Sequence, residues 1–389
     1  MSDTHYIFID LLQVAIRRRH SLFRVPSADE WMMLYKTAQK QAVAGVCFCG
    51  VQRLPKEQKD SLPELLKMQW LALATQIQIR NEQMNRRCVE LQKMLEEEGM
   101  MGCILKGQGV AKLYKIRNEE LGVRNGVNLG LYRQSGDIDV WVDKVRDDVI
   151  DFVMQNAPTR EFDQKHIHFH VFEDVDVEMH WIPVNMESPR FNRILGEYFR
   201  KESSRQFANR SGKVCYPTVD FQLVHQLLHV YAHYVYEGVG LRQMMDLYFA
   251  LRASYENQNE NTSTGSAQAV SDNYLRVLAL FKKLEFMRFV AATQWVLGEV
   301  FQLPREQMLC EPNADEGQQL LDEIMIGGNF GHHDVRNHVE GESFFGRFFR
   351  RWGRKFRMFR FDPLGTILIP FSRIKLEIWM RKVRSQYGV

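Results

Sequence analysis

The sequence predicts an α+β protein in which a small mixed β-sheet core is flanked by N-terminal and C-terminal helical regions. Apolar residues recur at helical spacing near the start of the chain and again in its second half. Between these stretches, apolar and polar residues alternate, which is typical of half-buried strands. We expect an N-terminal helical region, an α/β core, a C-terminal helical domain and a basic aromatic tail, at residues 1–100, 101–185, 186–340 and 341–389.

Composition places the chain among ordinary globular proteins. Its 389 residues are 45% hydrophobic and 25% charged, enough for two or three domains. The net charge of +3 gives no global nucleic-acid signature, because such a signature needs clustered charge. The start lacks a signal-peptide pattern, no uncharged apolar run is as long as a membrane span, and the scattered cysteines fit a reduced core. We therefore expect a cytoplasmic protein, and nothing in the pattern specifies an oligomeric state.

Two helix starts are visible in the N-terminal region. Ser27, followed three residues later by Glu30, predicts a capped helix start just before an apolar run. Pro63 predicts the start of a long helix that runs to Glu98, with Gly99 near its end.

The α/β core begins with a short apolar strand and a glycine turn. Cys103–Leu105 is apolar, Lys106–Gly109 is a turn, and residues 110–114 begin a helix. Gly107 allows a ligand to approach the backbone closely, and free N–H groups at a helix start favour phosphate. Lys106 adds a positive charge, so the turn is a candidate phosphate site.

Two aspartates alternate with apolar residues at the start of the next strand. Neighbouring strand residues point to opposite faces, so Asp137 and Asp139 share one face while Ile138 and Val140 fill the core. Two adjacent like charges are costly to hold together unless a cation lies between them. The pair is a candidate divalent-metal site, with a sheet-edge cap or pairing with arginines as the alternatives.

A second acidic strand follows in the same core. Residues 166–172 and 175–182 alternate and pair naturally as strands. In the second of these, Asp176, Glu178 and His180 share one face. If that strand lies beside the aspartate strand, Glu178 completes a cluster of three carboxylates that can hold two divalent ions, with Asp176 as the competing residue.

Three features of the second half have alternative interpretations. The polar stretch 254–272 is expected to be a mobile loop. His225, His229 and His233 recur every four residues, which indicates a helix packing face. A zinc site is the alternative, but no matching cluster of Cys or Glu residues lies nearby in the sequence. Arginines and aromatic residues alternate within 347–360, which fits packing on the protein, an anionic membrane or RNA.

An ordered set of motifs resembles a known family. The segments are Gly107-Gln108-Gly109, Gly136–Val142 and Glu178–Trp181. With Arg133 and the later Leu241–Asp246 segment, they resemble the polymerase-β-like nucleotidyltransferase superfamily, and more narrowly its large uncharacterised bacterial nucleotidyltransferase family.

The resemblance implies a two-metal enzyme that uses Mg²⁺ or Mn²⁺ to move an NMP from an NTP to an acceptor. It implies Asp137 and Asp139 as metal ligands and Glu178 as the third carboxylate. The candidate nucleotide-binding residues are Lys106, Gly107, Gln108, Arg133 and Arg242, with His180 and Asp246 as supporting residues. From the residues alone, Arg133 could instead pair with an aspartate, and Arg242 and Asp246, four apart on a helix, could form a simple ion pair.

Departures from the family pattern keep other functions open. The expected Gly-Ser turn is Gly107-Gln108, the third carboxylate is Glu, and the loop at 117–130 is longer than usual. These features allow a catalytically weak nucleotide-binding or partner-binding protein. A nucleotide-sugar glycosyltransferase also uses Asp-x-Asp, but it needs an α/β half where helices are expected here. The acceptor stays open among a small molecule, a glycan precursor, a protein and an RNA.

Overall fold

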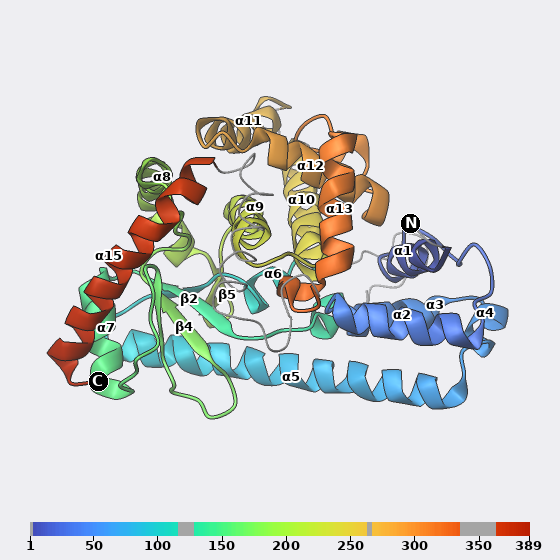
Figure 1. The fold of residues 1–389 in the computed structure, drawn as a ribbon, viewed down its shortest axis with the longest axis horizontal. Helices are drawn as coiled ribbons and strands as arrows, with labels where there is room; N and C mark the ends of the chain where they lie inside the picture. Colours follow the sequence, from blue (N-terminus) through green and yellow to red (C-terminus); the bar gives the residue numbers. More distant parts are fainter. Residues whose placement is uncertain (1–2, 116–127, 263–266, 335–362) are drawn as a thin grey trace.

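The computed structural model describes residues 3–115, 128–262, 267–334 and 363–389. A four-stranded sheet lies towards one end of an elongated molecule, and helices pack around it and form the other end (Figure 1). The predicted α+β class, a small mixed sheet flanked by helical regions, is confirmed.

The N-terminal region is helical, as predicted. Its elements are α1 (Asp3–Ala15), α2 (Ala28–Lys40), α3 (Ala44–Arg53), α4 (Lys56–Asp60) and α5 (Glu64–Glu97). The cap before α2 is confirmed: the Ser27 hydroxyl accepts the Glu30 backbone N–H, and the Glu30 carboxylate accepts the Ser27 N–H. Helix α5 follows Pro63 directly and ends just before Gly99, which has φ +67°.

The sheet has the order β1-β2-β4-β3. Its strands are β1 (Gly102–Ile104), β2 (Ile138–Val142), β3 (His166–His168) and β4 (Val177–His180). The central β2–β4 pair is parallel and both outer pairs are antiparallel, so the sheet is mixed. The connections contain α6 (Gln108–Ala111), η1 (Leu129–Tyr132) and α7 (Arg146–Asn156).

The second half is helical, with one short hairpin. Its elements are α8 (Pro189–Ala208), β5 (Arg210–Ser211), β6 (Val214–Cys215), α9 (Val219–Tyr236), α10 (Leu241–Thr262), α11 (Ala267–Lys283), α12 (Met287–Phe301), η2 (Arg305–Gln307), α13 (Ala314–Gly327), η3 (Asn329–Gly331) and α15 (Pro363–Tyr387). The prediction of a mobile loop at 254–272 is wrong for most of that stretch, because α10 continues to Thr262 and α11 begins at Ala267. These two helices pack on one another, and such packing outweighs a polar local composition.

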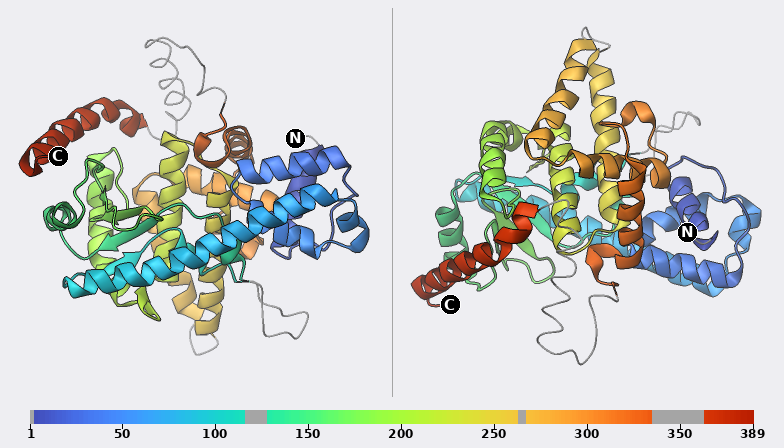
Figure 2. Two further views of the ribbon diagram at one scale, coloured as in Figure 1. Left: turned by 90° about the horizontal axis from the view of Figure 1, so that it is seen from below. Right: turned by 45° about the horizontal axis from the view of Figure 1, so that its top comes forward.

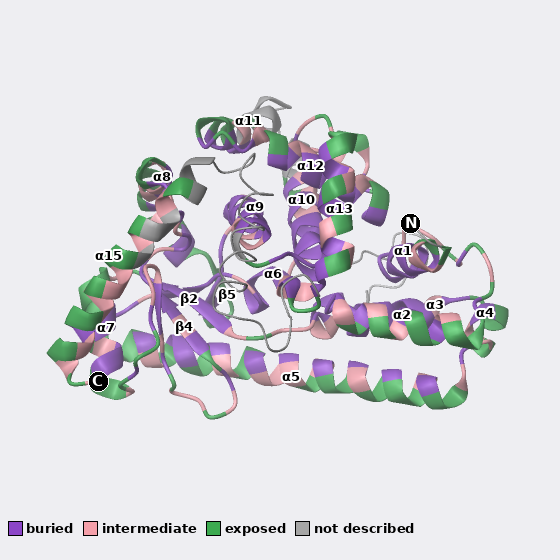
Figure 3. Cartoon of the chain, in the orientation of Figure 1, coloured by how far each residue is buried: buried purple, intermediate pink, exposed green. Residues whose placement is uncertain are grey.

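Two hydrophobic cores share helix α5. Leu66, Trp70 and Ala74 in its first half belong to the larger core, while Cys88 and Leu91 in its second half belong to the core beneath the sheet. Buried residues on α5 face the rest of the molecule along its whole length (Figure 3). The turned views show the same helix crossing both parts of the fold (Figure 2).

The N-terminal and C-terminal helical regions are not separate units. The larger core contains residues of both regions, from α1 to α13. Buried glutamines also join them: Gln13 donates to the Val300 carbonyl at 3.1 Å, and Gln41 donates to the Ile324 carbonyl at 2.9 Å. The two predicted helical regions therefore share one hydrophobic core.

The end of the tail packs on the sheet region. Trp379 of α15 meets the rings of Phe162 and Trp181, at centroid distances of 5.5 and 6.3 Å, and Val383 is buried in the core beneath the sheet. Arg146 lies over the Trp379 ring, 4.9 Å from its centroid. The segment 347–360, for which packing, membrane and RNA contacts were all considered, lies outside the described residues.

Two simpler expectations concern the cysteines and membrane spans. All six cysteines are free thiols, and five are buried: Cys47, Cys49, Cys88, Cys103 and Cys215. Burial raises the pKa of the Cys49 thiol to about 12, which makes this thiol unreactive. Within the described ranges, none of the helices has the length and apolar character that crossing a bilayer requires.

Candidate functional site

The parallel pairing of β2 and β4 brings two predicted carboxylates together. Asp139 lies directly opposite Glu178 in the register. Residues paired in this way point to the same face of a sheet, so both side chains converge on one point. The condition set by the sequence, that the Glu178 strand lies beside the aspartate strand, is met.

Two cationic or hydrogen-bonding groups lie against these carboxylates. The His180 Nε2 atom is 3.0 Å from Asp139 Oδ1 and 3.2 Å from Glu178 Oε2. Lys106 follows β1 in the chain, and its ammonium lies 2.6 Å from Asp139 Oδ1. Asp139 and His180 are fully buried, and Lys106 and Glu178 are largely so. The group is a buried cluster of two carboxylates, an ammonium and an imidazole.

The electrostatics keep both carboxylates ionised. Burial opposes ionisation, but Lys106 and the hydrogen bond from His180 outweigh it and hold the pKa of Asp139 well below its usual value. Against burial and the charge of Asp139, the same two partners lower the pKa of Glu178 to about 2. Burial alone would lower the pKa of His180, yet its bonds to the two carboxylates raise it.

Asp137 lies at the edge of this cluster. It precedes β2 and is half-buried, and the charge of Asp139, followed by burial, raises its pKa despite the opposing effect of Lys106. Gly107 is close by: a Cβ added to it would lie 3.4 Å from the Asp137 carbonyl oxygen. Gly107 has φ +54° and ψ −105°, a conformation that side chains on L-residues rarely adopt. The glycine turn and the aspartate strand are therefore neighbours, as predicted.

Arg133 and Asp246 form a separate buried pair. The Arg133 Nε and Nη2 atoms donate to the two Asp246 oxygens, both at 2.7 Å, and the Tyr114 hydroxyl donates to Asp246 Oδ1 at 2.6 Å. The aspartate-pairing alternative for Arg133 is the one that the geometry supports. The alternative Arg242–Asp246 ion pair is not what forms, because Asp246 is taken by Arg133 and Tyr114.

Two further nucleotide-binding candidates differ in their surroundings. The Gln108 side chain turns away from the carboxylates and donates to the Asn81 carbonyl at 3.2 Å and to Asn85 at 2.8 Å, both on α5. Arg242 donates to the Gln134 carbonyl at 2.9 Å, three residues before Asp137. Its Nε atom is buried without a hydrogen-bond partner. Of these two residues, only Arg242 contacts the segment that leads into the aspartate strand.

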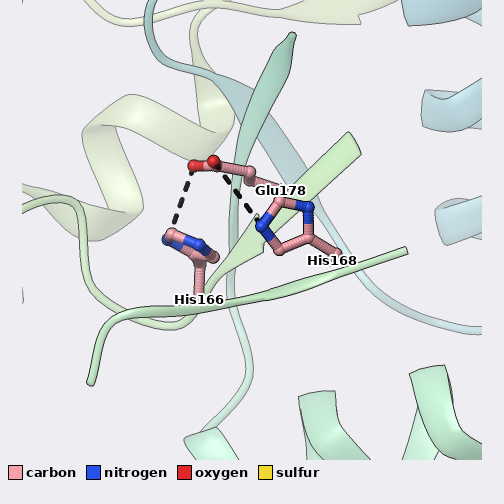
Figure 4. A group of neighbouring side chains, drawn as sticks. All are labelled: His166, His168 and Glu178. Atoms are coloured by element: carbon pink, nitrogen blue, oxygen red, sulfur yellow. Dashed lines mark ion pairs between the residues drawn. The ribbon is translucent and has the colours of Figure 1, made fainter. Parts of the chain in front are cut away.

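Sequence reasoning missed two histidines that face Glu178. His166 and His168 lie on β3, where the antiparallel register sets them opposite His180 and Glu178. Figure 4 shows both rings turned towards the Glu178 carboxylate. Burial, followed by the charge of His180, lowers the pKa of His166 to about 3. The alternation of His166, Ile167 and His168 was the available signal, since it places both histidines on one face.

The histidines of α9 are packing residues. The His225 ring stacks on Phe221 at 6.2 Å and on His229 at 6.1 Å between centroids, and His233 meets the His229 ring edge-on. In the part of the chain that the structure describes, no metal-competent group contains them. The packing interpretation is the one that the geometry supports.

The carboxylate cluster is a group of ligands that could hold a divalent cation. Asp139, Glu178 and His180 place one ligand atom each within 4.8 Å of one another. The Asp139 Oδ2 atom is buried without a hydrogen-bond partner, although its Oδ1 atom has two. A buried, ionised oxygen without a donor is costly, and a cation would satisfy it. Asp137 belongs to no such group among the described residues, so its side chain would have to move towards Asp139 and Glu178 to bind the same ion.

Comparison with known proteins adds one finding. Residues 27–284 match a family described as uncharacterised nucleotidyltransferases, and this match includes every predicted site residue. No curated protein and no solved structure matches the chain. The matched range covers more than half of the sequence, both central strands and the helix that carries Arg242 and Asp246. The chain belongs to the uncharacterised nucleotidyltransferase family.

Proposed function

We propose that the protein is a nucleotidyltransferase that moves an NMP from an NTP to an acceptor with Mg²⁺ or Mn²⁺. The observation that carries the proposal is the β2–β4 register, which sets Asp139 beside Glu178 and leaves Asp139 Oδ2 buried and unpaired. Family membership supports nucleotidyl transfer as the class of activity.

Asp137, Asp139 and Glu178 would hold the cation. Carboxylate oxygens are the ligands that Mg²⁺ prefers, and these residues lie on or next to two adjacent strands. When bound, the cation would neutralise charge on the phosphates and bring the attacking and leaving oxygens into line. The low pKa of Glu178, about 2, makes it a better ligand than a general base for the acceptor hydroxyl.

The remaining residues hold the carboxylates and the nucleotide. Lys106 keeps Asp139 ionised, and its ammonium can turn to a triphosphate once a metal neutralises the aspartates. His180 bonds both Asp139 and Glu178 and so fixes their separation. Gly107 lets the backbone approach the triphosphate, and Arg242 lies where it can add a second positive charge.

The geometry weighs against the glycosyltransferase alternative. Such an enzyme needs a nucleotide-binding α/β half before the Asp-x-Asp motif, whereas the segment before β1 consists of helices α1 to α5. The weakly active alternative stays open as an outcome of the test, because the serine hydroxyl of the usual turn is missing and the Gln108 amide nitrogen in its place donates to α5. A small molecule, a glycan precursor, a protein and an RNA are the acceptor classes to be compared.

The test is transfer of label from each NTP, with Mg²⁺ or Mn²⁺ and a cell extract as the source of acceptors. Asp139→Asn should abolish labelling while circular dichroism stays unchanged. Asp176→Asn is the matched control, because it removes the same charge from an exposed position just before β4, the strand that carries Glu178. Full activity of Asp139→Asn would refute the assignment, and nucleotide binding without any transfer by the natural protein would favour the weakly active alternative.

A further inference from the structure

Two histidines and a glutamate converge at the edge strand of the sheet. His166 and His168 project from the edge strand β3 towards Glu178 on β4 (Figure 4). Their ligand atoms all lie within 4.8 Å of one another. This group differs in chemistry from the carboxylate cluster, because two of its three ligands are imidazole nitrogens.

The distances are those of ligands around an ion rather than of hydrogen-bonded partners. His166 Nδ1 lies 3.4 Å from Glu178 Oε2, and His168 Nε2 lies 3.9 Å from Glu178 Oε1. Both separations exceed the usual range for an N–H···O bond, which ends at about 3.2 Å. Two ligands that are each about 2.1 Å from a tetrahedral metal are about 3.4 Å apart.

An unsatisfied nitrogen points into this space. His166 is 8% exposed, and its Nδ1 atom is buried without a hydrogen-bond partner. The Asp163 carboxylate lies 3.5 Å from the same nitrogen, but it already accepts the backbone N–H groups of Lys165 and His166. A buried imidazole nitrogen that faces a carboxylate without bonding to it carries a desolvation cost, which a metal ion would offset.

The group is reachable and partly supported from outside. The His168 side chain is 27% exposed, which gives an ion a path to the site. The Glu161 carboxylate lies 3.8 Å from His168 Nδ1, the nitrogen that points away from Glu178. A carboxylate behind a ligating histidine orients the ring and makes it a stronger ligand.

We propose that His166, His168 and Glu178 form a binding site for a borderline divalent transition metal, Zn²⁺ foremost. Two imidazoles and one carboxylate match a zinc site with three protein ligands and an open fourth position. Nitrogen ligands also disfavour Mg²⁺, which prefers oxygen. The site goes beyond the proposed nucleotide transfer and does not depend on it.

Glu178 joins this site to the carboxylate cluster. Its Oε2 atom faces both His166 Nδ1 and His180 Nε2, at 3.4 and 3.2 Å. A metal held by the histidines therefore competes for, or shares, the oxygen that the proposed transfer site uses. A transition metal would therefore bind through two histidine nitrogens, which Mg²⁺ disfavours, and would affect the Mg²⁺ site through Glu178.

The experiment is titration of the metal-free full chain with Zn²⁺ by calorimetry, without nucleotide. One equivalent should bind to the natural protein, and His168→Gln should weaken binding at least about tenfold, the least that loss of even an outer-shell group costs. His168 is partly exposed, so this variant keeps the core intact, and circular dichroism checks its fold. Substitution with Co²⁺ should give a visible spectrum typical of nitrogen ligation.

Two variants decide where the metal lies. His170→Gln is the matched control: it is the next histidine along the chain and its ring lies 5.9 Å from that of His168, but it does not belong to the group. It should bind Zn²⁺ normally, as should Asp139→Asn. Equal affinity in His168→Gln and the natural protein would overturn the proposal, and so would loss of Zn²⁺ binding in Asp139→Asn alone. Absence of nucleotide transfer would leave these results unaffected, so the two proposals fail separately.

Discussion

Two buried charge clusters of this protein contain similar residues but differ in how far their hydrogen bonds are satisfied. In the closed cluster, Tyr114 and Arg133 use both oxygens of Asp246, and no buried side-chain atom of the three lacks a partner. In the open cluster, around Asp139 and Glu178, three buried atoms lack one: Asp139 Oδ2, His180 Nδ1 and His166 Nδ1. The difference fits our proposal, in which the closed cluster stabilises the fold and the open one binds a ligand.

The sharpest way to break this comparison is to remove one carboxylate charge from each cluster. Asp246→Asn leaves the buried Arg133 without its counter-ion, and we expect the free energy of unfolding to fall by about 3 kcal/mol. Asp139→Asn also removes an ionised carboxylate, but Lys106 keeps Asp137 and Glu178 as neighbouring charges, so the free energy of unfolding should fall by less, about 1–2 kcal/mol. Urea denaturation of both variants measures the difference, and equal losses would contradict the distinction.

The glycine turn provides a second test, on binding rather than folding. Gly107→Val should raise the NTP dissociation constant at least tenfold, about 1.4 kcal/mol, because the turn loses its close backbone approach. Gly99→Val is the matched control, since Gly99 also has a positive φ but has open space around it and lies at the end of α5. Both variants lose stability, and calorimetry with NTP should separate them. Unchanged affinity in Gly107→Val would place the triphosphate elsewhere.

The third test asks whether an unpaired buried atom is enough to identify a ligand site. His225 Nδ1 is also buried without a partner, yet its ring is stacked between Phe221 and His229. Burial lowers the pKa of His225 to about 3, so below pH 6.5 the unfolded chain binds a proton that the folded chain does not. Stability should therefore fall between pH 6.5 and 3, by about 1.4 kcal/mol per pH unit for this group.

His225→Phe keeps the stacking and removes the titration. Urea denaturation at pH 7.5 and pH 5.5 should show a smaller loss in this variant than in the natural protein. An identical pH dependence would mean that His225 is protonated in the folded state, which would make it a charged member of the open cluster rather than a packing residue.

Local patterns predicted much of the fold and part of the site. Alternation placed Asp139 and Glu178 on the strand face opposite the apolar core residues, and Pro63 and Gly99 marked the ends of α5. Helix α8 was predicted only as part of the helical domain at 186–340, without bounds of its own, although Pro189 at its start and the apolar residues within it carried the signal. The missing information was pairing over long sequence distances.

The partner of Arg133 illustrates this limit. Arg133 bonds to Asp246, 113 residues away. The Leu241–Asp246 segment marked this aspartate as a supporting residue, but no local pattern links it to Arg133. The Gln108 side chain similarly depends on where α5 passes, because its partner Asn85 lies 23 residues earlier. The spacing of His166 and His168 indicated a shared face, but it is the pairing of β3 with β4 that brings both side chains towards Glu178.

Helix α5 has a consequence for how the molecule unfolds. Its 34 residues span about 51 Å, so one continuous rod reaches from the N-terminal helices to the far side of the sheet. Fraying at either end exposes apolar side chains of one core and weakens the helix that the other core needs. The two cores are therefore thermodynamically coupled, and a ligand that tightens the sheet also protects the distant N-terminal helices from opening.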